Sequence, residues 1–295
     1  MKNKKDAVTP VAGEKCPFFR IHISKKFTGG VKMARFCTLC SSSSGNSAYI
    51  GCNAGGILID AGTNAKRLIM AMEHINVVPE SINAIFITHE HNDHVGALRV
   101  FASRYKVPVF ASAGTLNALE KAGHLKGDFE AFVLPENGTE IRGMEIKGFR
   151  TSHDSAESFG YSVTLPDERR ISIVTDTGVI TSDIMEKVTG SDLILLESNH
   201  DKNMLNAGPY PYYLKKRILS DVGHLSNEDC AKAACHFVNT GTTRLVLGHL
   251  SRENNTAYKA FEKTNIALGE MGAVADLDYV LQVAPAGVGE RMVIF

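Results

Sequence analysis

The sequence has no excess of charge of either sign. Its 32 lysines and arginines are balanced by 32 aspartates and glutamates, so the formal net charge is zero. A protein without a net positive field does not attract nucleic acid or an anionic membrane over long range. Binding of a polyanion must therefore come from a local patch or from bound cations.

Cysteine and long apolar runs are also scarce. Six cysteines in 295 residues are too few for a disulfide scaffold and suit a reducing compartment. No stretch reaches the roughly 18 apolar residues of a membrane span. The N-terminus, "MKNKKDAVTPVAGEK", is basic but lacks the apolar segment of a secretory signal. We expect a cytoplasmic protein that does not associate with membranes.

The chain contains no short internal repeat, no heptad pattern and no linker that would divide it. Residues 1–32 are polar and aperiodic, so we expect a disordered N-terminal extension followed by a single domain over 33–295. Apolar periodicity predicts helices over 64–75, 95–105 and 113–123, and strands over 35–40, 47–51 and 82–87. Two strand-rich blocks, each flanked by helices, indicate two sheets packed face to face in an α/β or α+β domain.

A dense group of metal-binding side chains follows the strand pattern "INAIFI". Residues 88–94 read "THEHNDH" and contain His89, His91, Asp93 and His94. Imidazole nitrogen and carboxylate oxygen suit zinc, manganese or iron. One histidine here would fit a polar loop that caps a helix, whereas three histidines with an aspartate favour a metal site.

Three further candidates each follow a strand pattern: His153 after "GFRTS", Asp176 at the end of "ISIVTD", and His249 after "RLVLG". Alone, each would be an ordinary loop residue. Together with the first group they make seven possible ligands at the ends of strands, where proteins of this class place their chemistry. Asp60, which ends the strand pattern "ILID", is either a partner of a ligating histidine or a turn-forming residue.

These residues resemble the metallo-β-lactamase fold superfamily, and the resemblance runs from about Met33 to the C-terminus. It implies a four-layer αββα sandwich and two divalent metal ions, zinc or manganese. By this resemblance His89, His91 and His153 hold one ion. Asp93, His94 and His249 hold the second, and Asp176 bridges the two. Such ions are expected to share a hydroxide for in-line attack on a phosphodiester, with Asp93 orienting it.

Longer strings are similar to the YycJ/WalJ branch of that superfamily, namely "SSSSGNSAYI", "LLESNHD", "GHLSNEDC" and "LGHLSRENN". The resemblance implies a 5′-to-3′ exonuclease acting on double-stranded DNA. Two alternatives stay open: a thioesterase of the glyoxalase-II type, and a non-catalytic, metal-stabilised regulatory module. No obligate protein partner is evident, and the sequence does not predict the oligomeric state.

A general acid for the leaving oxygen is predicted from two of these strings. "LLES" ends at Glu197, and "GHLS" places His224 just before a helix capped by Ser226. In related transfer-RNA-processing members a histidine and a glutamate in comparable strings have this role, which implies the same pairing here. The alternative is that His224 only packs at the start of the helix.

Two segments are candidates for substrate binding. In "SSSSGNS", Ser43, Ser44 and Asn46 either bind a phosphate or form a flexible polar turn. In "PYYLKKRILS", Lys215 and Lys216 lie beside tyrosines, a combination that suits nucleic acid but also fits a solvated helix face. Arg252, shortly after His249, is a further phosphate candidate.

Overall fold

The structure is a computed structural model that describes residues 33–287 and 292–295. The predicted extension, residues 1–32, lies outside the described residues. No helix in the described part of the chain is long and apolar enough to cross a membrane.

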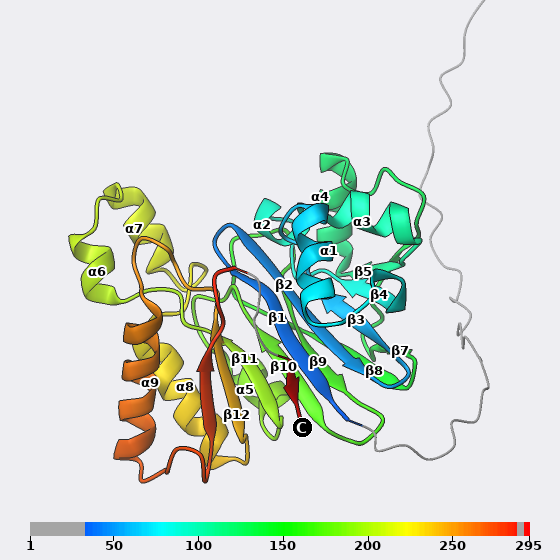
Figure 1. Ribbon diagram of the computed structural model, residues 1–295. Helices are drawn as coiled ribbons and strands as arrows, with labels where there is room; N and C mark the ends of the chain where they lie inside the picture. Colours follow the sequence, from blue (N-terminus) through cyan, green and yellow to red (C-terminus); the bar gives the residue numbers. More distant parts are fainter. Residues whose placement is uncertain (1–32, 288–291) are drawn as a thin grey trace, which may run out of the picture. The chain divides into compact units, whose positions relative to one another are not determined.

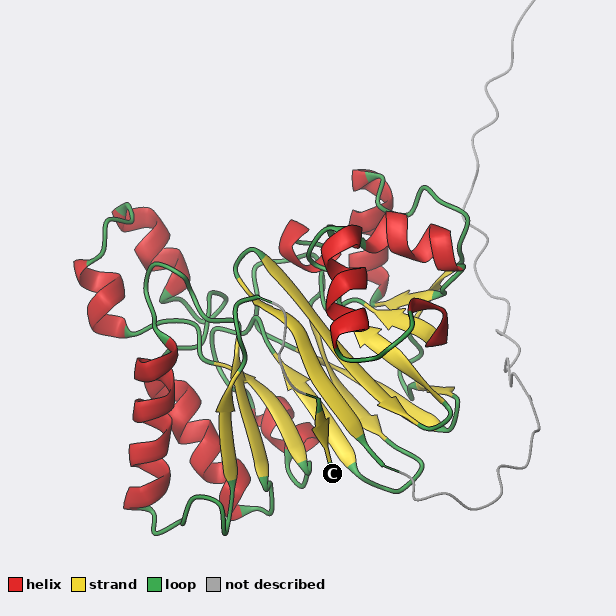
Figure 2. Ribbon diagram, viewed as in Figure 1, coloured by secondary structure: helices red, strands yellow, loops and turns green. Residues whose placement is uncertain are grey.

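Two seven-stranded mixed sheets form the centre of the described domain (Figures 1 and 2). In spatial order, the first sheet contains β14 (Val293–Ile294), β1 (Arg35–Ser42), β2 (Gly45–Cys52), β3 (Gly55–Ile59), β4 (Ile82–Phe86), β5 (Val109–Ala111) and β6 (Ala131–Val133). The second contains β13 (Val280–Val283), β12 (Arg244–Gly248), β11 (Leu193–Glu197), β10 (Arg170–Val174), β9 (Phe159–Thr164), β8 (Met144–Arg150) and β7 (Thr139–Ile141).

Helices cover the outer faces of the two sheets. The segments of the first half are α1 (Ala65–His74), η1 (Pro79–Ser81), α2 (Asn92–Val95), α3 (Leu98–Tyr105) and α4 (Ala113–Ala122). Those of the second half are α5 (Ser182–Val188), α6 (Lys202–Ala207), α7 (Tyr212–Ile218), α8 (Asn227–Asn239) and α9 (Ala257–Glu270). Helices α1, α3 and α4 share one apolar cluster with the first sheet, and α5, α8 and α9 share another with the second. The predicted four-layer αββα sandwich is confirmed.

The residue pattern of β11 shows why the sheets are buried on both faces. Successive side chains of a strand point to opposite faces. In "LILLE", Leu193 and Leu195 join the cluster between the sheets, whereas Ile194 and Leu196 pack against the outer helices. A continuous apolar run of this kind is typical of a strand with helices on one side and a second sheet on the other.

Helix ends follow local sequence signals. The predicted helix at 113–123 is α4, whose N-cap Ser112 accepts a hydrogen bond from the Thr115 amide. Gly123 ends it with φ +79°, a left-handed conformation that glycine adopts without steric cost. The predicted helix at 64–75 is α1, with Leu68 and Met72 buried as expected.

The predicted helix over 95–105 is present as α3, but it begins only at Leu98. The structure has the short α2, a break at Gly96 and Ala97, and then α3. The Ala97 amide donates to the carbonyl of Ala61 at 2.8 Å. This contact with a distant segment replaces the hydrogen bond that would have continued the helix, and apolar periodicity cannot reveal it.

Parallel strands bring distant loops to one edge of the sandwich. β3 to β6 run parallel in the first sheet, and β10 to β13 run parallel in the second. The carboxyl ends of neighbouring parallel strands meet at the same edge. Within the second sheet, the segments that follow β10, β11 and β12 therefore emerge close together. The segment after β4 in the first sheet reaches the same edge, since His89 lies beside Asp176.

Candidate metal centre

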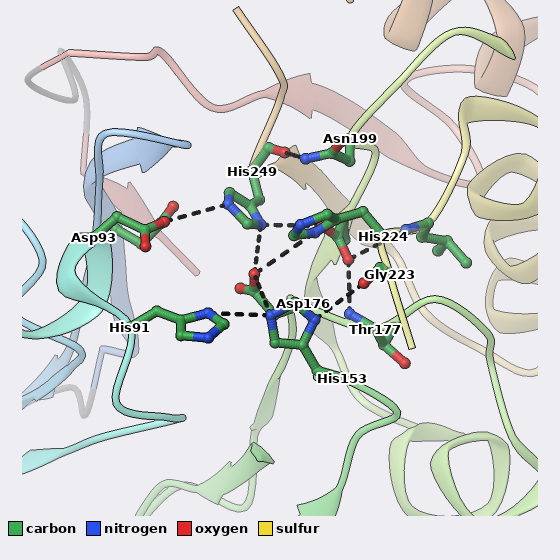
Figure 3. A network of polar contacts seen from close by, with 12 residues as sticks. His91, Asp93, His153, Asp176, Thr177, Asn199, Gly223, His224 and His249 are labelled. Atoms are coloured by element: carbon green, nitrogen blue, oxygen red, sulfur yellow. Dashed lines mark hydrogen bonds and ion pairs between the residues drawn. The ribbon is translucent and has the colours of Figure 1, made fainter. Parts of the chain in front are cut away.

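All seven predicted ligands lie together at this edge of the sandwich. Their side chains form three overlapping groups in which the possible ligand atoms lie within 4.8 Å of one another. The first group is His89, His91 and His153, and the second is Asp93, His94 and His249. A third group, His89, His94 and Asp176, lies between them. Figure 3 shows side chains from separate loops converging on Asp176.

The loop after β4 is held in a tight turn against its neighbours. The Ala61 amide donates to the carbonyl of His94 at 2.8 Å. A Cβ atom at Gly62 would lie 1.6 Å from the carbonyl oxygen of Asp93, so only glycine allows this approach. The turn places Asp93 and His94 in α2, directly after the N-cap residue His91.

The first group consists of three imidazoles. His91 Nδ1 lies 3.0 Å from His89 Nε2 and 3.4 Å from His153 Nε2. The other ring nitrogen of His153 lies 3.0 Å from the carbonyl oxygen of Gly223, to which it donates as Nδ1–H. Burial lowers the pKa of His89 and of His153. Neutral rings with a lone pair directed at a common point are the form in which histidine binds metal.

In the second group, carboxylates hold both histidines by their Nδ1 atoms. Asp60 Oδ2 lies 2.7 Å from His94 Nδ1 and also accepts from the Thr88 hydroxyl, so the partner interpretation of Asp60 holds. Glu197 Oε1 lies 3.0 Å from His249 Nδ1. The Nε2 atoms of His94 and His249 lie 3.4 and 3.7 Å from Asp93 Oδ2.

Asp176 lies between the groups. Its Oδ2 is 3.3 Å from His94 Nε2, and its Oδ1 is 3.2 Å from His249 Nδ1 and 3.8 Å from His153 Nε2. Oδ2 is buried and has no hydrogen-bond partner in the part of the chain that the structure describes. A buried carboxylate oxygen without a partner, surrounded by imidazole nitrogens, fits a position next to a cation.

The charges of the second group also indicate a cation site. Burial lowers the pKa of His249, but Asp176, Asp93 and Glu197 outweigh burial and raise it to about 10. The carboxylates therefore require positive charge at this position. A divalent cation meets that requirement as well as a proton does, so the donor set fits the metal ions that the resemblance implies.

The predicted pairing of Glu197 with His224 is present. Glu197 is fully buried, and its Oε1 lies 2.8 Å from His224 Nδ1. Its Oε2 accepts from the Thr177 amide at 2.8 Å. Burial raises the pKa of Glu197, but His224 and His249 outweigh burial and leave the pKa below its ordinary value. The sequence did not reveal that this one carboxylate holds both histidines.

His224 itself reaches the surface. Its side chain is 18% exposed, whereas those of His89, His94 and His249 are buried. Within residues 33–287 and 292–295 its Nε2 makes no hydrogen bond. This ring nitrogen is therefore open to a molecule that binds at the site.

The segment "SSSSGNS" forms the turn between β1 and β2. Ser43 and Ser44 are exposed at the tip. Asn46 is buried and donates from Nδ2 to the Ser42 carbonyl at 3.0 Å and to Asp93 Oδ2 at 3.1 Å. Its Oδ1 accepts from the Ser42 amide. The amide of Asn46 is thus engaged with the protein. Ser44 Oγ lies 3.0 Å from Ser42 Oγ but remains exposed, as does Ser43.

The three predicted basic residues also differ in whether they are engaged with the protein. Lys215 Nζ donates to the Asn206 carbonyl at 2.7 Å. Lys216 and Arg252 are exposed and form no ion pair with any described residue. Lys216 and Arg252 are therefore available to a substrate, whereas Lys215 joins α7 to α6.

Sequence reasoning missed the groups that fix the backbone of the site. Asp60, Asp176 and His249 adopt positive φ angles of 63°, 57° and 54°. Left-handed backbone at a non-glycine residue costs on the order of 1 kcal/mol and needs support. At His249 this support comes from Asn199 Nδ2, which donates to its carbonyl at 2.9 Å, and from Ser41 Oγ, which accepts from its amide at 2.8 Å.

Comparison with known proteins agrees with this geometry. A family model described as "Beta-lactamase superfamily domain" matches residues 56–250. The exodeoxyribonuclease YycJ of Bacillus anthracis is 34% identical over 254 residues, covering 82% of this chain and 95% of the relative. The exodeoxyribonuclease WalJ of Streptococcus pneumoniae serotype 2 is 38% identical over 224 residues, covering 75% of this chain and 83% of the relative.

A solved structure with the same fold is the metallo-β-lactamase fold protein YhfI from Bacillus subtilis. It superposes with a TM-score of 0.67 over 90% of this chain and all of the other, at 12% sequence identity. At this identity the likeness concerns the fold alone.

Proposed function

Since this chain belongs to the metallo-β-lactamase superfamily and, within it, to the YycJ/WalJ family, we propose that it is a metal-dependent exodeoxyribonuclease. We further propose that it digests double-stranded DNA from the 5′ end. The observation that supports this best is the complete set of seven clustered ligand candidates, with the Glu197–His224 pair beside them.

The donor set would divide between two divalent cations, zinc or manganese. His89, His91 and His153 would hold one, and Asp93, His94 and His249 would hold the other. Asp176 would contact both, since among the described carboxylates it alone approaches histidines of both groups. When bound, such cations offset the charge of the phosphodiester and polarise its phosphoryl oxygen.

The remaining steps belong to the chain's own side chains. Asp93 would orient the attacking water, because Asn46 fixes its carboxylate. Glu197 holds Nδ1–H of His224, so that Nε2 can give a proton to the leaving oxygen of the cleaved strand. Ser43, Ser44 and Arg252 would contact phosphates, since all three are exposed and lie within three residues of Asn46 or His249 in the chain.

A direct test uses metal-loaded protein and four substrates. These are end-labelled duplex DNA, single-stranded DNA, structured RNA and a glutathione thioester, each with zinc or with manganese. We expect nucleotide release from duplex DNA, with a 5′ label released first. Turnover of the thioester without nucleotide release would instead establish the thioesterase alternative.

Asn46 gives a prediction that separates positioning from substrate contact. Removing the partner of a metal-ligating group typically lowers metal affinity or activity by about 10- to 100-fold. Asn46→Ala should therefore weaken metal binding by at least about tenfold, because Asp93 Oδ2 loses its donor. Titration with zinc against a competing chelator measures this affinity.

The matched control is Ser43→Ala, which changes an exposed residue of the same turn. It should leave metal affinity unchanged. If Asn46→Ala keeps full metal affinity and raises only the KM for DNA, Asn46 contacts substrate and its positioning role is wrong.

A further inference from the structure

Helix α7 is tied to the metal centre at its C-terminal end. Arg217, near its C-terminal end, forms a two-point ion pair with Asp154, the neighbour of His153. The turn after the helix carries Gly223, whose carbonyl contacts His153 Nδ1, and His224, whose amide donates to the Ile218 carbonyl. Lys215, also in the last turn, joins the helix to α6. Figure 1 shows α6 and α7 at the edge of the sandwich that also carries α2.

Two tyrosines of α7 are left in solvent. Tyr212 is 81% exposed and Tyr213 is 74% exposed. Lys216 follows them by four and three residues, so on a helix it is the surface neighbour of both. With Lys215 and Arg217 engaged elsewhere, two open aromatic rings and one unpaired ammonium group form this surface.

This combination suits one class of ligand. An aromatic ring stacks on the face of an unpaired base of any sequence, and an ammonium group contacts the adjoining phosphate. Base pairs inside a duplex offer no free face to such rings. An exonuclease that digests duplex ends must separate the terminal bases before or during cleavage, so unpaired bases arise beside its metal centre.

We propose that Tyr212 and Tyr213 stack on unpaired bases next to the phosphodiester being cleaved, and that Lys216 contacts the backbone of the same strand. The inference rests on the proposed function. It adds that the bound form of the substrate is a DNA end whose terminal bases are no longer paired. Because such stacking does not depend on the base, we expect digestion without a preferred base.

The test measures binding of a short phosphorothioate-linked, single-stranded oligonucleotide, which resists cleavage, by fluorescence anisotropy. Tyr212→Ala and Tyr213→Ala should each weaken binding by about tenfold. Tyr212→Phe and Tyr213→Phe should keep it, because the ring remains. Lys216→Gln should reduce the slope of log affinity against log salt by about 0.7.

Tyr258 on α9 provides a matched control, since it is also strongly exposed, at 69%. Tyr258→Ala should bind the oligonucleotide like the wild type. Unchanged binding in the variant that lacks both Tyr212 and Tyr213, or an equal loss in Tyr258→Ala, would overturn the inference.

Failure of the proposed function is detected separately. Hydrolysis of bis-p-nitrophenyl phosphate, which carries neither nucleobases nor a DNA strand, should be equal in the wild type and in the Tyr212, Tyr213 and Lys216 variants. The wild type could bind the oligonucleotide through Tyr212 and Tyr213 and yet release no nucleotide from DNA. That result would support the contact surface on α7 and contradict the proposed exonuclease activity.

Discussion

Asp176→Ala is expected to leave about one metal ion per chain and to lose nearly all hydrolysis of DNA. Its two oxygens lie 3.2 Å from His249 Nδ1 and 3.3 Å from His94 Nε2, and Oδ1 also lies 3.8 Å from His153 Nε2. No other described carboxylate approaches histidines of both groups. Charge stabilisation by a bound metal contributes several kcal/mol, which corresponds to about 10³-fold or more in rate.

The measurements are the metal content of the purified variant by mass spectrometry and the release of nucleotides from labelled duplex DNA. Asp183→Ala, which removes an exposed aspartate at the start of α5, is the control and should keep both ions and full activity. Two ions per chain in Asp176→Ala would show that Asp176 does not bridge them.

The gathering of the seven ligand candidates could be predicted because most of the signal is local. His89, His91, Asp93 and His94 occupy one short segment directly after a strand, and a strand pattern can be read from its apolar residues. Parallel strands then bring later strand ends to the same edge. No spacing rule, however, links His249 to Glu197, which lies 52 positions earlier in the chain. That contact depends on the pairing of β11 with β12.

Polar residues were harder to place than apolar ones. The strand β1 was predicted to end at Cys40 but continues through Ser41 and Ser42, which pair with Asn46 and Gly45. A serine-rich string carries no strand pattern, so its hydrogen bonds to distant groups are invisible in the sequence. For the same reason the buried amide of Asn46 could not be distinguished from the exposed hydroxyls of Ser43 and Ser44.

His224→Ala is expected to keep both metal ions and normal affinity for DNA while turnover falls at least tenfold. A positioned acid typically contributes about 10² to 10⁴ in rate. Glu197 Oε1 lies 2.8 Å from Nδ1 and thereby directs Nε2 away from the protein core. Glu197 also contacts His249, so replacing Glu197 would disturb two groups at once. Replacing His224 removes the acid alone.

The geometry also allows His224 to be a metal ligand. His224 shares a possible ligand group with Asp176, Glu197 and His249, so loss of a metal ion from His224→Ala would make it a ligand rather than an acid. His236→Ala on α8, which removes a histidine that contacts Thr189 outside the site, is the control for general effects on the fold. Metal content and turnover number, measured together on both variants, distinguish the two roles.

Comparing two substrates with different leaving groups tests whether His224→Ala has lost proton donation. The alkoxide released from DNA needs a proton, whereas p-nitrophenolate is stable without one. An acid at His224 Nε2 therefore predicts that His224→Ala hydrolyses bis-p-nitrophenyl phosphate at nearly the wild-type rate while its turnover of DNA falls at least tenfold. Equal losses on both substrates would mean that His224 supports the metal centre as a whole, since Asp176 Oδ1 lies only 3.7 Å from its Nδ1. Full turnover on DNA would reduce His224 to a residue that packs at the start of α8.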